Sequence, residues 1–471
     1  MNKKNLTGLE KFAYGIGAVA KDMVFMLAAS YILYYYQDIM GVSAWVMGII
    51  LMIARVLDAF NAPIMGVIVA KTNSRWGRFR PWVFIGTLLN AFVLYFMFAC
   101  PPNLNGAGLA AYAAASYILW GVTYTMMDIP FWSMIPAFTE SGSERENLSA
   151  LARSCAGLGS SIISIVTVMT VSAIGTALGG TTSREVERLG FKYFALIIAV
   201  IFVVFTTITC LGIKEKSNVN MKSASVRDMF RALIKNDQAI ILVITIVIIN
   251  TALYTPQNLL IYFFKYDFCR EAWQTDYALF NTCCGAFQIL AMMILFKICR
   301  NFMNTMKIFS LSMGMAMAGY MILLIIAVSG SSDVYLLLIP AFLIMAAIGM
   351  LNVIVTVFLA NMVDYGEFMS GRRDESVIFS MQTFVVKLAS GISALIASIV
   401  LTAFNISSDE DMTASSALAA GQKLGLRTSM TILPVIILVI GFIVFKRHYI
   451  LTDEKLSEIL DELHSRRDRN H

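Results

Sequence analysis

The stretch SAWVMGIILMIARVLDAFNAPIMGVIVA, residues 43–70, is long and apolar and carries only two charged residues, Arg55 and Asp58. An α-helix needs about 20 predominantly apolar residues to cross the hydrocarbon core of a bilayer. The stretch therefore predicts a membrane-spanning helix, with Arg55 and Asp58 on one face of it. A charge at the centre of a membrane helix costs about 2.5–3.5 kcal/mol on insertion scales, which makes both residues candidates for function.

Stretches of this kind recur along the whole chain and determine the fold class. The 471 residues are 58% hydrophobic and 14% charged, with a mean hydropathy of +0.73, whereas soluble proteins have roughly a quarter charged residues. We predict an all-α membrane protein with twelve transmembrane helices. Their approximate ranges are 13–37, 43–70, 82–100, 108–137, 153–177, 192–213, 238–264, 276–298, 305–329, 333–362, 378–404 and 428–447.

The distribution of Lys and Arg between the loops predicts the orientation of these helices, because basic loops face the cytoplasm. The loop KTNSRWGRFRPW (71–82) is basic, whereas QDIMGVSAW (37–45) and PPNLNGAG (101–108) contain no Lys or Arg. A predicted external loop at 178–191 contains two Arg, offset by two Glu. We therefore expect a multi-pass protein of the cytoplasmic (inner) membrane with both termini in the cytoplasm.

A hydrophilic segment divides the chain into two halves. We predict a six-helix N-terminal half at 1–213, a cytoplasmic linker at 214–237 with a short amphipathic helix near 225–235, a six-helix C-terminal half at 238–448 and a cytoplasmic tail at 449–471. Two such halves are the organisation of major-facilitator carriers, in which the substrate binds near the bilayer midplane and access alternates between the two sides.

Further ionisable residues lie inside other predicted spans. They are Lys21 and Asp22 in the first span, Asp128 in the fourth, Arg153 at the start of the fifth and Lys387 in the eleventh. Together with Arg55 and Asp58, these residues could line one water-filled cavity and partly neutralise each other. The alternative is that they form ion pairs that hold helices together, and an Arg near a helix end can also extend to the interface.

The fourth span, YILWGVTYTMMDIPFWSMIP (117–136), has the side chains of a sugar site. Thr125, Asp128 and Trp132 are spaced so that a hydroxyl, a carboxylate and an indole project from one helix face. A carboxylate accepts hydrogen bonds from sugar hydroxyls, an aromatic face packs on the apolar side of a sugar ring, and Tyr124 is a further amphipathic contact. The alternative for Trp132 is a place in an interfacial aromatic belt.

Enzyme chemistry has little support in this sequence. The segment GIGAVAKD (15–22) departs from a phosphate-binding loop at its second Gly and at its Ser/Thr, and a Gly-rich membrane helix explains it better. The three His residues, at 448, 464 and 471, lie in or beside the C-terminal tail. We therefore predict no enzyme activity and no cofactor, and the net charge of +6 needs no nucleic-acid partner.

Seven motifs carry a resemblance to a known family. They are KFAYGIGAVAKD, ARVLDAFNAPIMG, SRWGRFRPW, YILWGVTYTMMDIPFWSMIP, KNDQ, VDYGE and SMQTFVVK, which run in this order from residue 11 to about residue 390. They closely resemble those of the bacterial melibiose carriers. These carriers belong to the glycoside–pentoside–hexuronide:cation symporters of the major facilitator superfamily. The resemblance covers nearly the whole chain and is most specific in the fourth span.

The resemblance implies a sugar site. Asp22, Asp128 and Trp132 match the positions that hold the galactosyl ring. The positions that line, support or close this pocket match Lys21, Tyr124, Arg153, Thr383 and Gln382.

The resemblance also implies a site for the coupling cation. Asp58, Asn61 and Thr125 match cation-site positions, and Na⁺ is the metal that Asp58 and Thr125 would hold. Lys387 matches a lysine between the two sites and is a candidate coupling residue. Spaced four residues apart, Lys387 and Thr383 also place an ammonium and a hydroxyl on one helix face.

Two departures from the family pattern affect these expectations. The family cation site has a second carboxylate where this chain has Ala62, which removes a charge and oxygen ligands that hard cations prefer. In MLNVIVTVF (350–358), Asn352 replaces a cavity-facing Trp and Val355 replaces a Gln. The second departure alters the sugar pocket, so melibiose itself is not assured as the substrate.

The sequence predicts a galactoside:cation symporter in the lipid bilayer, with a small glycoside as substrate and Na⁺, Li⁺ or H⁺ as the coupling cation. A lone buried carboxylate suits a proton, because desolvation disfavours its charged form. The alternatives are an uncoupled or proton-coupled glycoside carrier, a glucuronide or pentoside transporter, and a sugar sensor that does not transport.

The segment DYGEFMSGRRDE (364–375) is a candidate cytoplasmic gate. We expect Asp364, Glu367 and Arg372 to pair with the basic loop 71–80 in one conformation and to separate in the other. The alternative is a solvated charged loop.

Overall fold

The computed structural model describes residues 6–72, 74–138, 142–213, 237–268, 273–330, 333–370, 375–406 and 419–451, with residues 455, 458, 459 and 462 of the tail. Every regular element within these ranges is helical, as the sequence predicts. The amphipathic helix predicted near 225–235 and most of the predicted tail lie outside the described residues.

Six long helices form from the first part of the chain. They are α1 (Gly8–Tyr34), extended by the π-helical turn η1 (Tyr35–Ile39), α2 (Ala44–Lys71), α3 (Arg80–Phe98), α4 (Gly106–Phe138), α5 (Gly142–Ala177) and α6 (Ser183–Gly212). The second part forms α8 (Asp237–Tyr262) with η2 (Phe263–Phe268), α9 (Trp273–Leu290) with η3 (Ala291–Leu295) and α10 (Phe296–Phe302), α11 (Thr305–Val328), α12 (Val334–Ser370), α13 (Glu375–Ala403) and α14 (Ala420–His448).

The helices have the lengths that a membrane requires. Eleven helical segments in the described part of the chain are long and apolar enough to cross a bilayer. Helix α4, with 33 residues, forms where the fourth span is predicted, but it is not one of these eleven segments.

The predicted external loop 178–191 is wrong over most of its length, because α6 already begins at Ser183. The side chain of Thr182 caps the helix by accepting a hydrogen bond from the Glu185 backbone N–H. In return the Glu185 carboxylate accepts hydrogen bonds from the Thr181 backbone N–H and hydroxyl. This capping places Arg184 and Arg188 in the first turns of a helix.

The candidate gate 364–375 is also partly helical rather than a loop. Helix α12 continues to Ser370, directly before Gly371 in the sequence, and Gly is a common residue just past a helix end. Tyr365 is buried in this last part of α12 and donates a hydrogen bond to Asp237 Oδ1, at 3.1 Å. The contact stabilises the extension because it ties α12 to the first residue of α8.

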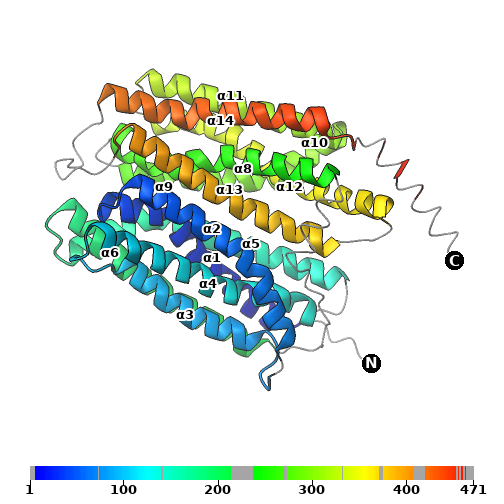
Figure 1. Cartoon of the computed structure of the whole chain (residues 1–471), viewed down its shortest axis with the longest axis horizontal. Helices are drawn as coiled ribbons and strands as arrows, with labels where there is room; N and C mark the ends of the chain where they lie inside the picture. The colour runs from blue at the N-terminus through cyan, green and yellow to red at the C-terminus, as the bar shows by residue number, and fades with distance from the viewer. Residues whose placement is uncertain are drawn as a thin grey trace. The chain divides into compact units, whose positions relative to one another are not determined.

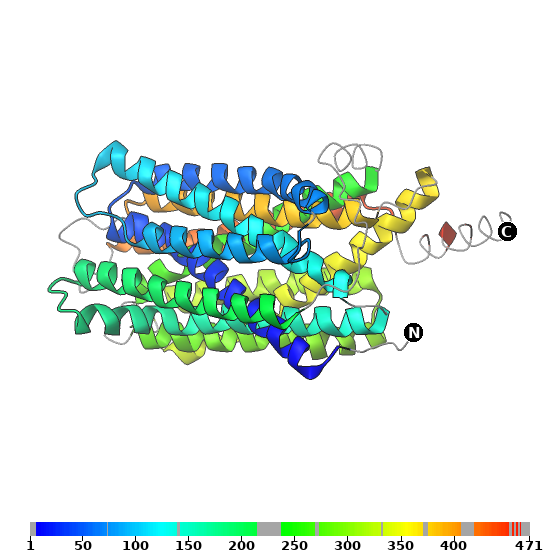
Figure 2. The ribbon, with the colours of Figure 1, turned by 90° about the horizontal axis from the view of Figure 1, so that it is seen from below.

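The chain divides into two compact units. The first contains Met1–Ser223, Ala272–Asn281 and Ile406–Ser416, and the second contains Ala224–Glu271, Thr282–Asn405 and Ala417–His471. Most long helices of the first unit run in a similar direction in both ribbon views, and α1, in dark blue, crosses them at an angle in Figure 2 (Figure 1, Figure 2). In the second unit, α11 packs on α12, and α8 packs on both α13 and α14.

The second unit has an aromatic core and a buried ion pair. The ring of Phe445 lies 4.4 Å from those of Phe309 and Tyr449, measured between centroids. The guanidinium of Arg427 on α14 donates two hydrogen bonds of 2.7 Å to the fully buried Asp267 carboxylate in η2, which follows α8. Such a bidentate pair joins two helix ends in a fixed geometry.

In the first unit, α1 packs on α5 and α6. Helices α5 and α1 approach closely at Gly159, where an added Cβ would overlap the backbone carbonyl of Val19. Small residues allow membrane helices to come this close, which favours van der Waals packing between their backbones. Gly159 therefore sets the distance between two helices that both carry candidate site residues.

We expect the substitution Gly159→Ala to destabilise the protein by about 1–3 kcal/mol, the usual cost of overpacking. Thermal unfolding of the detergent-solubilised protein measures the effect. Gly157→Ala, two residues away on the same helix, is the matched control, because a Cβ at 157 meets no atom within 4 Å. Equal melting temperatures for the two variants would contradict the assigned contact.

Candidate functional site

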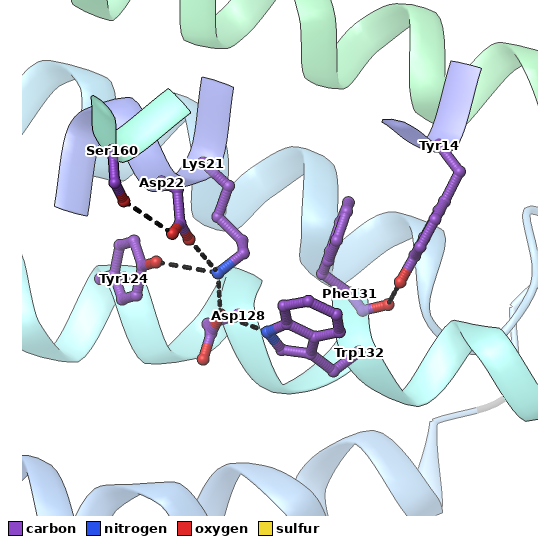
Figure 3. A network of polar contacts seen from close by, with 8 residues as sticks. All are labelled: Tyr14, Lys21, Asp22, Tyr124, Asp128, Phe131, Trp132 and Ser160. Atoms are coloured by element: carbon purple, nitrogen blue, oxygen red, sulfur yellow. Dashed lines mark hydrogen bonds and ion pairs between the residues drawn. The ribbon is translucent and has the colours of Figure 1, made fainter. Parts of the chain in front are cut away.

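The centre of the candidate site is the ammonium group of Lys21, a buried residue of α1 (Figure 3). Lys21 Nζ lies 2.7 Å from Asp128 Oδ1 and 3.1 Å from Asp22 Oδ1. It also donates a hydrogen bond of 3.1 Å to the hydroxyl of Tyr124. One cation from α1 thus bridges two carboxylates, from α1 and α4, and the group has one negative charge in excess.

Trp132 completes this group on α4. Its indole Nε1 donates a hydrogen bond of 3.1 Å to Asp128 Oδ1, the same oxygen that accepts from Lys21. The Lys21 ammonium also lies 5.0 Å from the centre of the indole, within cation–π range. The spacing of Asp128 and Trp132 on one face of α4 is therefore confirmed as a direct contact.

Arg153 lies on α5 beside the same indole. Its guanidinium carbon is 5.4 Å from the centre of the Trp132 ring, and its side chain is exposed. Three elements, α1, α4 and α5, thus bring together Lys21, Asp22, Tyr124, Asp128, Trp132 and Arg153, six of the residues that the sequence assigns to a sugar site.

Arg55 and Asp58 form a second charged group in the first unit, on α2. Arg55 Nη1 lies 3.8 Å from Asp58 Oδ2, and both side chains are buried, with 6% and 8% of their surface exposed. The Arg55 guanidinium lies 5.6 Å from the Phe25 ring and 5.7 Å from the Tyr117 ring. The sequence placed this pair on one helix face, and the aromatic rings around the cation were not foreseen.

Gly121 on α4 leaves room for the Asp58 carboxylate. A Cβ at residue 121 would lie 2.5 Å from Asp58 Oδ1, too close for any side chain. Helices α2 and α4 are in contact, so the carboxylate of one helix lies directly against the backbone of the other.

Two polar side chains that the resemblance assigns to the cation site have buried atoms without a hydrogen-bond partner in the described part of the chain. In the described part of the chain, the buried atoms Thr125 Oγ1 and Asn61 Nδ2 have no hydrogen-bond partner. Leaving a buried polar atom unpaired is unfavourable, so both atoms are candidates for contact with a bound polar species. Ala62, on the same helix as Asn61, is half-buried and adds no oxygen ligand.

Aromatic side chains connect the two charged groups. Phe25, which contacts Arg55, packs on Tyr124 with ring centres 5.5 Å apart. Tyr124 in turn bonds Lys21. The two cations therefore contact the same pair of packed rings.

The remaining predicted residues lie elsewhere or outside the described part. Lys387 is half-buried on α13 and Asn352 is exposed on α12, both in the second unit. Thr383 and Gln382 belong to α13, and Asp364 and Glu367 to α12, but their side chains lie outside the described residues. Arg372 is itself outside the described residues.

The structure adds site residues that the sequence analysis missed. Ser160 on α5 donates a hydrogen bond of 3.0 Å to Asp22 Oδ2. Tyr14 stacks on Phe131, with ring centres 4.5 Å apart, and donates a hydrogen bond of 2.7 Å to the Phe131 carbonyl. The spacing of seven residues from Arg153 to Ser160, two helical turns, was the available signal for Ser160.

The chain matches the family described as MFS/sugar transport protein over residues 13–453. It is 28% identical over 407 residues to the isoprimeverose transporter of Lactiplantibacillus pentosus, covering 86% of this chain and 82% of the relative. It is 25% identical over 459 residues to the putative glycoside/cation symporter YagG of Escherichia coli (strain K12), covering 97% and 95%.

A solved structure shares the fold. The bacterial homologue of the human lysosomal transporter Spinster, in its inward-facing and unoccupied conformation, has a TM-score of 0.66 at 12% identity, covering 96% of this chain and 97% of that one. The family match confirms the resemblance drawn from the seven motifs. This protein is a membrane transporter, not an enzyme, and it belongs to the MFS/sugar transport protein family.

Proposed function

We propose that this protein is a glycoside:cation symporter of the cytoplasmic membrane, with both termini in the cytoplasm, and that it moves its substrate by alternating access. The observation that carries the proposal is the Lys21 group, in which one ammonium joins Asp22 and Asp128 beside the Trp132 indole. Polar groups of this kind are costly inside a membrane, and a polar substrate that visits them explains their presence. The names of the two relatives, which refer to glycosides, support the same substrate class.

The group has the chemistry that a sugar needs. Asp22 and Asp128 accept hydrogen bonds from adjacent hydroxyls, and Lys21 donates to a hydroxyl or ring oxygen. The half-buried Trp132 offers its face to the apolar side of the ring. A galactoside is the proposed substrate, because the motifs of the first and fourth spans are those of galactoside carriers.

Counterflow in proteoliposomes tests this function. Vesicles loaded with unlabelled sugar should take up labelled sugar transiently, over a panel of α- and β-galactosides, glucuronides and pentosides. Exchange of a galactoside supports the proposal, and preference for a glucuronide or pentoside would replace the substrate. A sensor would bind sugar without exchange, so binding with no counterflow would overturn transport.

A second candidate is a glycoside carrier that is proton-coupled or uncoupled. Asp58 already lies beside the Arg55 guanidinium, and Ala62 contributes neither charge nor oxygen. Sodium prefers several hard oxygen ligands, whereas a proton needs a single carboxylate. Uptake driven by an imposed Na⁺ gradient, a proton gradient or neither separates the candidates: sugar accumulates against its gradient only when the coupling ion is supplied.

We expect Ala62→Asp to give the carrier a sodium response. The new carboxylate would lie one turn from Asp58 on α2. The two carboxylates would carry two negative charges against the single positive charge of Arg55, which leaves one negative charge for Na⁺ to balance. Na⁺-stimulated uptake should rise about tenfold over the parent, equivalent to about 1.4 kcal/mol. Ala62→Asn, which adds an oxygen but no charge, is the control, and an equal response from it would contradict the charge argument.

A further inference from the structure

The contact between α1 and α5 places a hydroxyl on one of the two acids of the site. Gly159 allows the α5 backbone to meet α1 at Val19. The next residue, Ser160, then reaches Asp22 and donates a hydrogen bond of 3.0 Å to its Oδ2 atom (Figure 3). Ser160 and Asp22 are both half-buried, so this contact is more exposed to solvent than the buried Lys21.

Each of the two acids accepts two hydrogen bonds, but the acids differ in which of their oxygens accept them. Both oxygens of Asp22 are occupied, since Oδ1 accepts from Lys21 and Oδ2 accepts from Ser160. Both donors on Asp128, Lys21 and Trp132, converge on Oδ1. Within the described residues, Asp128 Oδ2 has no hydrogen-bond donor, and in Figure 3 it points away from Lys21 and Trp132.

We propose that Ser160 is a positioning residue of the sugar site: it holds Asp22 through Oδ2, and it leaves Asp128 Oδ2 as the acid oxygen that first accepts a substrate hydroxyl. This inference rests on the proposed function and deepens it, because it assigns different roles to the two acids. Both carboxylates have the same exposure, 22% of the side chain. The difference between them therefore comes from their bonding and not from access to solvent.

The physical basis is the competition for Lys21. A hydroxyl that donates to a carboxylate makes a charge-assisted hydrogen bond, which is stronger than a neutral one. With Ser160 in place, Asp22 is oriented from both sides, and Lys21 is kept between the two acids. Without the hydroxyl, Asp22 has a free oxygen that turns toward Lys21 or toward a substrate hydroxyl, and the geometry offered to the sugar is lost.

The first experiment measures sugar counterflow by S160A, S160T and S161A in proteoliposomes. We expect S160A to raise the half-saturating sugar concentration about tenfold with little change in the maximal rate, because it weakens binding by about 1.4 kcal/mol. S160T retains the hydroxyl and should restore the parent value. S161A is the matched control, because among the described residues the Ser161 hydroxyl bonds the Gly157 carbonyl of its own helix and no other group.

An unchanged half-saturating concentration in S160A, or an equal rise in S161A, would overturn the proposal. The proposal would also be overturned if S160T failed to restore the parent half-saturating concentration, because the shape of the side chain and not its hydroxyl would then matter.

The second experiment needs no sugar. Carboxyl labelling by a water-soluble carbodiimide, with peptides identified by mass spectrometry, reports how far each acid is engaged. In S160A the labelling of Asp22 should rise several-fold relative to that of Asp128, and in S161A the ratio should stay at the parent value. An unchanged ratio in S160A overturns the proposal. Should the parent exchange no sugar of the panel, the proposed function fails, and the labelling ratio still decides the role of Ser160.

Discussion

Asp128→Asn should reduce sugar counterflow about 100-fold, because it removes the negative charge of a carboxylate that accepts hydrogen bonds from Lys21 and Trp132 and, in the proposed function, from a substrate hydroxyl. An amide has nearly the same shape as a carboxylate, so packing around residue 128 is preserved. The amide has only one acceptor oxygen, and its NH₂ group repels Lys21 and Trp132, the two donors whose hydrogen bonds Asp128 accepts. Lys21 then turns fully to Asp22, which lies 3.1 Å away.

The measurement is the initial counterflow rate per reconstituted protein, with protein amount and melting temperature determined for each variant. Trp132→Phe serves as the comparison, because it removes the indole donor and keeps the carboxylate charge. We expect it to lose much less activity than Asp128→Asn. Undiminished exchange by Asp128→Asn would remove the basis for a sugar site at this group.

Lys21→Gln should have the largest effect on stability. It leaves Asp22 and Asp128 without the ammonium that lies between them, in a site where the Lys21 side chain is only 4% exposed. Removing one partner of a buried ion pair typically costs about 3–5 kcal/mol, since the remaining charge stays uncompensated. Here two carboxylates remain, and sugar exchange should be lost together with stability.

A double-mutant cycle separates this effect from general damage. The loss of stability caused by Lys21→Gln should be smaller when Asp128 is already Asn, because one of the two carboxylate charges that would lose the ammonium is then absent. Thermal unfolding of the parent, both single variants and the double variant gives the coupling. Lys192→Gln, on α6 of the same unit, is the control for loss of a lysine charge and should cost at most about 1 kcal/mol, the value of its cation–π contact with Tyr193. Additive effects of Lys21→Gln and Asp128→Asn would contradict the shared ammonium.

Much of the fold follows from the sequence, because the cost of burying an unpaired backbone in lipid leaves helices as the solution for each long apolar stretch. The prediction succeeds for the ninth span, predicted at 305–329, where α11 covers Thr305–Val328. It fails at element ends that capping decides, such as the start of α6, where Thr182 and Glu185 extend the helix into the predicted loop. Hydropathy does not detect such caps, because the residues that form them are polar.

The sequence by itself determined the relations within each helix. Arg55 and Asp58, or Asp128 and Trp132, had to meet because a helical repeat of 3.6 residues places them on one face. The charged residues inside these predicted spans also indicated a polar substrate, without any knowledge of the fold.

Only the tertiary structure decided which side chains on different helices come into contact. That Lys21 bridges to Asp128, and that Ser160 and not its neighbour Ser161 reaches Asp22, depends on the rotation and distance of α1, α4 and α5. The distance between α1 and α5 depends on the close approach of their backbones at Gly159. The physical reason is that residue spacing fixes angles around one helix axis, whereas the contact between two axes depends on packing summed over their whole length.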